Sequence, residues 1–271
     1  GAAWAGPDGD RLPGQPPRPG ARPLQANDSG TLARYIQWAS TAVVGAASQP
    51  RSNCSGHGAP PDNQSGEVGR AVYLVRSRDD GKTFEPERVV SPEASGACGC
   101  CGMRAFADAQ GHVFALFRSA STTLDRHMML LVSGDHGEHF KGDYVHQWRV
   151  GQCPMSSEFL GELGGRVLGA WETAGAVQFA ALDAKSGKAA APLSPPPLLK
   201  GKHPALAVNA AGETLLTWAE GTGWQRGGAV AWQIFAKDGQ PLGSPQRRDG
   251  VPVWSLPAAL AEADGSFTVL H

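Results

Sequence analysis

The residues of this chain best equipped for chemistry are its five cysteines, four of which fall in two short segments. Three stand in the run CGCCG at 98–102, and the fourth, Cys153, precedes a proline. In an oxidising compartment, loops without a core of their own are stapled by disulfides, and these four cysteines would form two bridges. That pairing leaves Cys54, in a Ser- and Gly-rich stretch, as a free or intermolecular thiol.

A soft-metal site is the alternative interpretation of the same segments. Two methionines and a histidine accompany the cysteines, and thiolates and thioethers together prefer Cu(I), while imidazole suits copper or zinc. The candidate ligands are Cys98, Cys100, Cys101, Met103, His127, Cys153 and Met155, with His57 and His203 as further imidazoles. Copper is therefore the only cofactor that the sequence suggests.

Two glutamates could form a catalytic pair. Glu172 directly follows Trp171, and Glu220 follows Trp218 with one alanine between them. Each glutamate stands where an apolar run ends. Two such carboxyls could hydrolyse a glycosidic bond with water as nucleophile. The other interpretation is an acidic residue at a strand end whose charge is solvated.

Three arginines and two tryptophans could bind a ligand nearby. Arg104, Arg118 and Arg126 could hold a carboxylate by bidentate hydrogen bonds, or the last two could bind carbonyls of the loop 119–125 or pair with Asp125. Trp224 and Trp254 could stack on a sugar ring or a peptide. Trp38, Trp171 and Trp218 recur at the ends of predicted strands, and this repeated position favours packing between the repeated units instead.

The elements that must position these residues are marked by a short turn signature that occurs twice. Its frame is SxDxGxxF, in which Ser and Asp oxygens accept backbone N–H groups, Gly supplies a positive φ and the closing Phe folds back onto the sheet. The two copies comprise Ser77, Asp79, Gly81 and Phe84, then Ser133, Asp135, Gly137 and Phe140. Degenerate copies at Asp183 and Asp238 continue a period of about 50 residues, as expected of repeated four-stranded units.

Three β-rich runs precede each acidic turn. Residues 203–208, 213–218 and 229–235 precede the last copy, and 104–107, 113–117 and 128–132 precede the second. With one strand after each turn, the pattern predicts four-stranded antiparallel sheets. The cysteines, Glu172, Glu220 and the arginines all fall in loops or strand ends on the side away from the acidic turns, which we call the loop rim.

The two turn signatures resemble the Asp box of the sialidase-like, or BNR-repeat, β-propeller superfamily. The resemblance covers about residues 31–270 and implies an all-β propeller of four-stranded antiparallel blades, of an atypical bacterial member. Six blades are expected, with five blades or an incomplete ring as alternatives. It does not carry over the family's catalytic set, because the tyrosines Tyr35, Tyr73 and Tyr144 are not placed on the loop rim.

Composition sets the remaining expectations. Residues 1–30 are rich in Pro and Gly and are predicted to be irregular, leaving 31–271 as the propeller domain. The net charge of −1 with dispersed basic residues argues against nucleic acid and anionic membranes, and no run is long enough for a membrane span. The beginning of the chain has no leader pattern, as expected of a mature or trimmed chain.

Together these features predict an exported bacterial protein, periplasmic or extracellular, and a monomer. Its function is predicted to be that of a binding module whose loop rim, bearing Cys, Met, His and Arg, takes a partner protein, a glycan or a soft metal such as copper. The alternative is a glycoside hydrolase of sialidase type.

Overall fold

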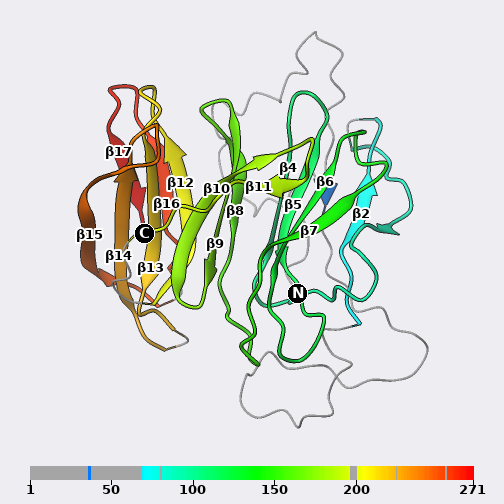
Figure 1. The fold of residues 1–271 in the computed structure, drawn as a ribbon, viewed down its shortest axis with the longest axis horizontal. Helices are drawn as coiled ribbons and strands as arrows, with labels where there is room; N and C mark the ends of the chain where they lie inside the picture. The colour runs from blue at the N-terminus through cyan, green and yellow to red at the C-terminus, as the bar shows by residue number, and fades with distance from the viewer. Residues whose placement is uncertain (1–35, 38–68, 80, 196–199, 224, 254) are drawn as a thin grey trace, which may run out of the picture. The chain divides into compact units, whose positions relative to one another are not determined.

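The computed structural model describes residues 36–37, 69–79, 81–195, 200–223, 225–253 and 255–271. Every regular element within these ranges is a β-strand (Figure 1). Predictions for Tyr35, Trp38, Cys54, His57, Trp224 and Trp254, and for residues 1–30, fall outside the described residues.

The strands form five antiparallel sheets, and three of them have four strands. The first sheet contains β1 (Ile36–Gln37), β2 (Tyr73–Arg76) and β3 (Arg88–Val89). The second contains β4 (Met103–Ala107), β5 (Val113–Arg118), β6 (Met128–Ser133) and β7 (Lys141–His146). The third contains β8 (Phe159–Leu163), β9 (Arg166–Thr173), β10 (Ala176–Asp183) and β11 (Lys188–Ala189). The fourth contains β12 (Gly201–Val208), β13 (Thr214–Glu220), β14 (Gly228–Phe235) and β15 (Pro241–Val251), and the fifth only β16 (Ala258–Ala261) and β17 (Phe267–Leu270).

Each sheet is a meander in which strands adjacent in sequence are also adjacent in space. In the second sheet, for example, Phe106 pairs with Phe114 and Phe117 pairs with Met129. The all-β fold with four-stranded antiparallel, blade-like sheets is thus confirmed. Closure of a ring and the number of blades are not shown by the described residues and stay predictions.

The two Asp-box turns have the predicted chemistry. Ser77 Oγ accepts the Gly81 N–H at 2.7 Å and donates to Asp79 Oδ1 at 2.8 Å. Gly81 has φ 84°, which an L side chain rarely adopts. The equivalent residues of the second turn repeat these bonds: Gly137 N to Ser133 Oγ at 2.8 Å, and Ser133 Oγ to Asp135 Oδ1 at 2.7 Å.

The closing phenylalanines differ between the two turns. Phe140 packs against the apolar cluster that contains Val72 and Leu131, as predicted. Phe84 is 46% exposed, so the prediction that it folds back onto the sheet is wrong.

The core lies between neighbouring sheets. Trp171 of β9 is fully buried against Phe114 and Leu116 of β5, and Trp218 of β13 is buried against Leu168 of β9. The prediction that these tryptophans pack between sheets is confirmed. Such packing fixes the loops at the sheet ends relative to one another.

Candidate functional site

Three cysteines gather at the end of the sheets opposite the Asp-box turns. The Cys98 sulfur lies 3.2 Å from that of Cys101 and 3.4 Å from that of Cys153, and the remaining pair is 3.7 Å apart. None of these distances is that of a disulfide, which requires about 2.05 Å between the sulfurs. We call this group the thiol cluster.

The thiol cluster joins two connections that are far apart in sequence. Cys98 and Cys101 belong to the loop between β3 and β4, and the Cys98 N–H donates to the Arg118 carbonyl at the end of β5, at 2.8 Å. Cys153 belongs to the loop between β7 and β8. Cys98 and Cys101 are buried and Cys153 is half-buried, so the cluster is reached from the side of Cys153.

The surroundings of Cys101 and Cys153 favour the protonated thiols of these two residues. The hydrogen bond with Cys153, together with burial, raises the pKa of Cys101 to about 12, although Cys98 and the charge of Arg118 act in the opposite direction. For Cys153, the hydrogen bond with Cys101 lowers the pKa, but Cys98 and burial raise it to about 12. A cation that enters the cluster must therefore displace protons.

The expected disulfide framework differs from the structure. Two bridges were expected among Cys98, Cys100, Cys101 and Cys153, but none of the distances among Cys98, Cys101 and Cys153 is that of a disulfide. Cys100 is disulfide-bonded and takes no part in the cluster. The sequence could not show which of these cysteines forms the disulfide, because the direction of each side chain depends on the backbone path of the loop.

Three of the other predicted metal ligands have partners of their own. Met103 packs against the apolar cluster of Val72, and His127 Nδ1 accepts the Trp148 N–H at 2.8 Å. His203 Nδ1 accepts the N–H of Ser157 at 3.1 Å. Among the described His, Cys, Asp and Glu residues, only the three cysteines form a group close enough to share an ion.

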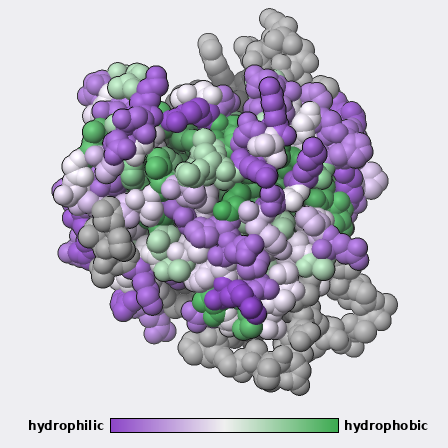
Figure 2. All heavy atoms as spheres, viewed as in Figure 1, coloured by the Kyte–Doolittle hydropathy of each residue, from purple (hydrophilic) through white to green (hydrophobic). Residues whose placement is uncertain are grey.

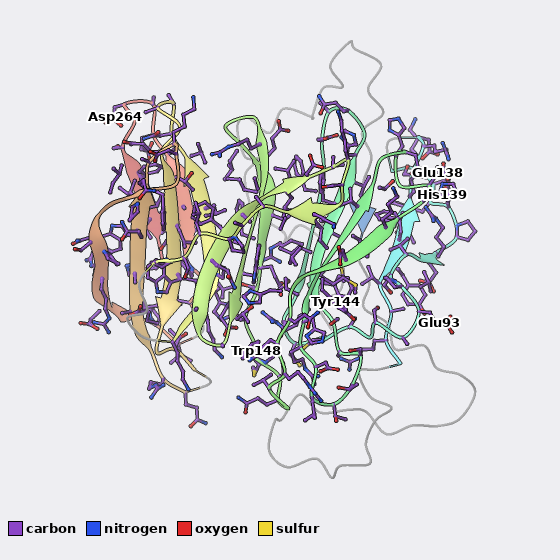
Figure 3. All side chains as sticks on the ribbon, in the orientation of Figure 1. Glu93, Glu138, His139, Tyr144, Trp148 and Asp264 are labelled. Carbon is purple, nitrogen blue, oxygen red and sulfur yellow. The ribbon has the colours of Figure 1, made fainter. Side chains whose placement is uncertain are left out.

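A buried charge network lies beside the cluster. Arg118 is fully buried, donates to the carbonyls of Arg126 at 2.8 Å and Glu172 at 2.5 Å, and lies with its guanidinium carbon 5.3 Å from the ring centroid of Trp148. Figure 3 labels Trp148 at the end of the sheets away from the turn residues Glu138 and His139.

Glu158, which directly precedes β8, is the functional candidate that the sequence interpretation missed. It is 1% exposed, and neither carboxyl oxygen has a hydrogen-bond partner within the described residues. Burial raises its pKa to about 8, against the opposing charge of Arg118. The run SSE at 156–158 has the composition of a solvated loop, so no local signal distinguishes this residue.

The two predicted catalytic glutamates are buried but already have partners. Glu172 Oε1 accepts the Gly175 N–H at 2.6 Å, and burial raises the pKa of this carboxyl. Glu220 accepts from Trp218 Nε1 at 2.8 Å and from Arg247 Nε at 3.1 Å. The expectation of a solvated charge is wrong for both, because Glu172 is 2% exposed and Glu220 is 1% exposed.

The three predicted ligand-binding arginines have hydrogen-bond partners on the backbone. Arg126 donates to the carbonyls of Thr122 and Asp125, which is the loop-binding alternative. Arg104 is exposed and donates to its neighbouring carbonyl, and Asp125 pairs with Arg149 at 3.1 Å. The charges of Arg104 and Arg118 both act on the Glu158 carboxyl, and a carboxylate clamp of all three arginines stays a prediction.

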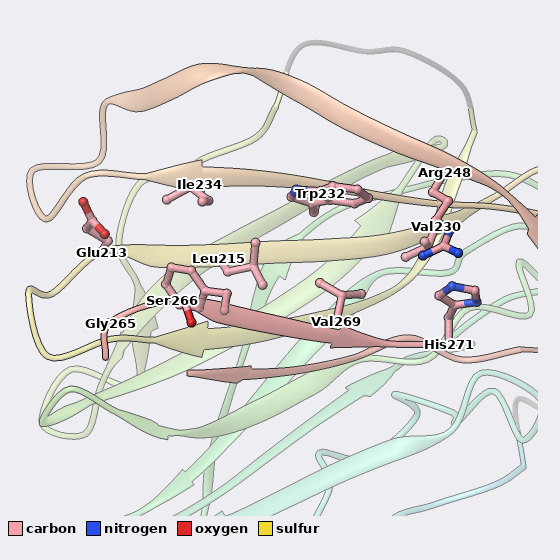
Figure 4. A pocket seen from close by; sticks show the side chains of 11 residues that line it. Glu213, Leu215, Val230, Trp232, Ile234, Arg248, Gly265, Ser266, Val269 and His271 are labelled. Carbon is pink, nitrogen blue, oxygen red and sulfur yellow. The ribbon is translucent and has the colours of Figure 1, made fainter. Parts of the chain in front are cut away.

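A cavity in another part of the molecule is lined mainly by apolar side chains. This cavity of about 480 Å³ lies between β13–β14 and β17, and its lining includes Leu215, Trp232 and Val269 (Figure 4). It lies where the two-stranded fifth sheet covers only part of the fourth. The face in Figure 2 is mostly hydrophilic, with apolar residues in separate groups. No helix long and apolar enough to cross a membrane occurs in the described part of the chain.

Comparison with known proteins finds likeness in structure but not in sequence. No family model and no curated protein matches the chain. Similar solved structures include the intramolecular trans-sialidase from Ruminococcus gnavus (TM-score 0.46, 13% identity) and the NanB sialidase from Streptococcus pneumoniae (0.48, 13%). The GH93 α-L-arabinofuranosidase of Fusarium graminearum is also similar (0.47, 13%).

Each of these likenesses covers 74% of this chain, and the chain spans 45%, 32% and 66% of the three structures, respectively. They are all carbohydrate-active enzymes by name. At such identities and TM-scores they say nothing about what this chain does, and its blade architecture rests on its own strand pairing.

Proposed function

We propose that this chain is an exported blade-repeat protein that binds a thiophilic metal ion, Cu(I), at the thiol cluster. The observation that carries the proposal is the convergence of three cysteine sulfurs from two distant loops within 3.2–3.7 Å. Hydrophobic packing alone does not require three thiols at one point, and soft thiolates select soft ions such as Cu(I).

The dimensions of the cluster support an ion among the sulfurs. The point equidistant from them is about 2 Å from each, and a metal–thiolate bond is about 2.3 Å, so a shift of a few tenths of an ångström suffices. Structural Zn(II) takes four ligands, whereas three thiolates complete a trigonal Cu(I) centre. With no fourth His, Cys, Asp or Glu ligand among the described residues, Cu(I) is favoured over Zn(II).

The cluster also has an electrostatic complement. Three thiolates and Cu(I) carry a net negative charge, and the buried guanidinium of Arg118 acts on the Cys101 thiol. A nearby cation stabilises the thiolate form and so assists metal binding.

A competition titration of the reduced protein with Cu(I) and a chromophoric Cu(I) chelator tests the proposal. One equivalent should bind, and Cys153→Ser should weaken the competition, because it removes one of the three sulfurs without opening the buried core and leaves Cys98 and Cys101 as a weaker pair. Met103→Leu is the matched control, since it conserves volume at a sulfur outside the cluster. Equal competition by Cys153→Ser and the parent, or stoichiometric Zn(II) with no Cu(I), would overturn the assignment.

The glycoside hydrolase alternative has less support. Glu172 and Glu220 each have hydrogen-bond partners, and Arg118 and Arg126 donate to backbone carbonyls. Absence of hydrolysis of aryl sialosides and aryl arabinofuranosides would agree with this assessment, and turnover sensitive to Glu172→Gln would reverse it.

A further inference from the structure

We infer that Lys202 and His203 of β12 are positioning residues for Cys153, holding the loop 150–158 so that its sulfur meets Cys98 and Cys101. This inference rests on the proposed metal-binding function and deepens it. It extends the site from the two loops that supply sulfur to the fourth sheet, which supplies none.

Four contacts fasten the loop to β12. Lys202 Nζ donates to the Pro154 carbonyl at 2.6 Å, and the His203 N–H donates to Ser156 Oγ at 3.2 Å. Nδ1 of His203 accepts the backbone N–H of Ser157 at 3.1 Å and lies 3.0 Å from the Ser157 hydroxyl. Two residues of one strand therefore hold three of the four residues that follow Cys153, namely Pro154, Ser156 and Ser157.

The backbone is strained on both sides of this contact. Met155 has φ 52° and His203 has φ 54°, in the left-handed region that residues other than glycine seldom adopt. The pairing of β12 with β13 also shifts register between Lys202 and Ala205. Strain of this kind persists only where surrounding contacts impose it, and it concentrates at functional sites.

The hydrogen bonds also define what His203 cannot do. A backbone N–H can only donate, so Nδ1 of His203 is an unprotonated acceptor and the ring of the neutral side chain carries its proton on Nε2. Neither nitrogen is then available to a metal. The side chain is 8% exposed and acts through the loop, as partners of metal ligands commonly do.

Two substitutions at His203 separate the role of the side chain from that of the backbone. Glycine accepts the positive φ without strain but removes the acceptor, whereas asparagine tolerates this φ and offers a carbonyl oxygen to Ser157. Lys202→Met keeps the aliphatic stem and removes the ammonium group. Lys200→Met, at an exposed residue two positions away, is the matched control.

The experiment measures two quantities on the full chain, reduced and metal-free at the start. The first is the alkylation rate of each thiol by N-ethylmaleimide, followed by mass spectrometry, with Cys98 as internal reference. The second is Cu(I) affinity by chelator competition. We expect His203→Gly and Lys202→Met to raise Cys153 alkylation about tenfold with Cys98 unchanged, and to weaken Cu(I) binding by about 10- to 100-fold.

His203→Asn and Lys200→Met should remain near the parent in both measurements. Unchanged Cys153 alkylation in His203→Gly and Lys202→Met would overturn the inference, as would an equal rise at Cys98, which indicates general loosening of the fold. If the parent binds no Cu(I) while Cys153 alkylation responds as expected, metal binding fails as the function and the positioning of Cys153 stands.

Discussion

Replacement of Glu158 by glutamine should stabilise the protein at neutral pH. The carboxyl is fully buried without a hydrogen-bond partner among the described residues, and burial raises its pKa from 4.5 to about 8. An acid whose pKa is higher in the folded state binds a proton that the unfolded chain has lost. Stability therefore falls as pH rises from the unfolded pKa to the folded one, and glutamine, which does not ionise, avoids this loss.

The magnitude follows from the two pKa values. Each unit of difference corresponds to about 1.4 kcal/mol, so ionisation of the unfolded chain costs the parent about 3 kcal/mol at pH 7. At pH 5 the same calculation gives about 1 kcal/mol. The stability advantage of Glu158→Gln should thus grow by about 2 kcal/mol between these two pH values, whatever small packing difference the amide introduces.

Urea unfolding of the reduced protein at several pH values between 5 and 8 measures this difference. Glu162→Gln, at an exposed glutamate within β8, is the matched control. A stability difference between parent and Glu158→Gln that stays constant from pH 5 to pH 8 would refute the argument, because it would show that the carboxyl is solvated or partnered in solution.

The other predictions concern the metal and the packing between sheets. Because the pKa values of Cys101 and Cys153 are raised to about 12, Cu(I) binding must release at least their two protons, and apparent affinity should rise at least about 100-fold per pH unit near neutrality. Competition titrations at about pH 6, 7 and 8 check this, and a flat profile would contradict it. Trp171→Ala should lower the free energy of unfolding by about 3–5 kcal/mol in urea, since the side chain is fully buried, and a loss below about 1 kcal/mol would show that the sheets repack. Arg247→Met should cost about 2–4 kcal/mol by leaving buried Glu220 without its cation, and the combined change with Glu220→Gln should recover part of that loss.

The Asp-box turns could be predicted from sequence because their chemistry is local. Ser77 and Asp79 bond to backbone groups within four residues, so the pattern of residue types contains the whole structure. The strands between the turns followed from their β-rich composition and spacing. Burial of Phe84 was predicted wrongly, since it depends on what lies beside the first sheet rather than on the turn.

The candidate site could be predicted only in part. That Cys98, Cys101 and Cys153 lie at the same end of the sheets follows from the repeat, but which thiols meet depends on the paths of two irregular loops. Glu158 and the burial of Glu220 escaped prediction because burial depends on residues distant in sequence, such as Arg247 of β15, which pairs with Glu220. Local sequence patterns contain no information about such distant residues.

The thiol cluster depends on the packing of three sheets. The loop before β4 carries two sulfurs, the loop before β8 carries the third, and β12 fastens the second loop through Lys202 and His203. The buried Trp171 and Trp218 fix the spacing of those sheets. An ion bound by the three sulfurs links neighbouring sheets and stabilises the folded state according to its free concentration, by about 4 kcal/mol at 1,000 times its dissociation constant. Metal affinity and the cohesion of the sheets are therefore two measures of the same geometry.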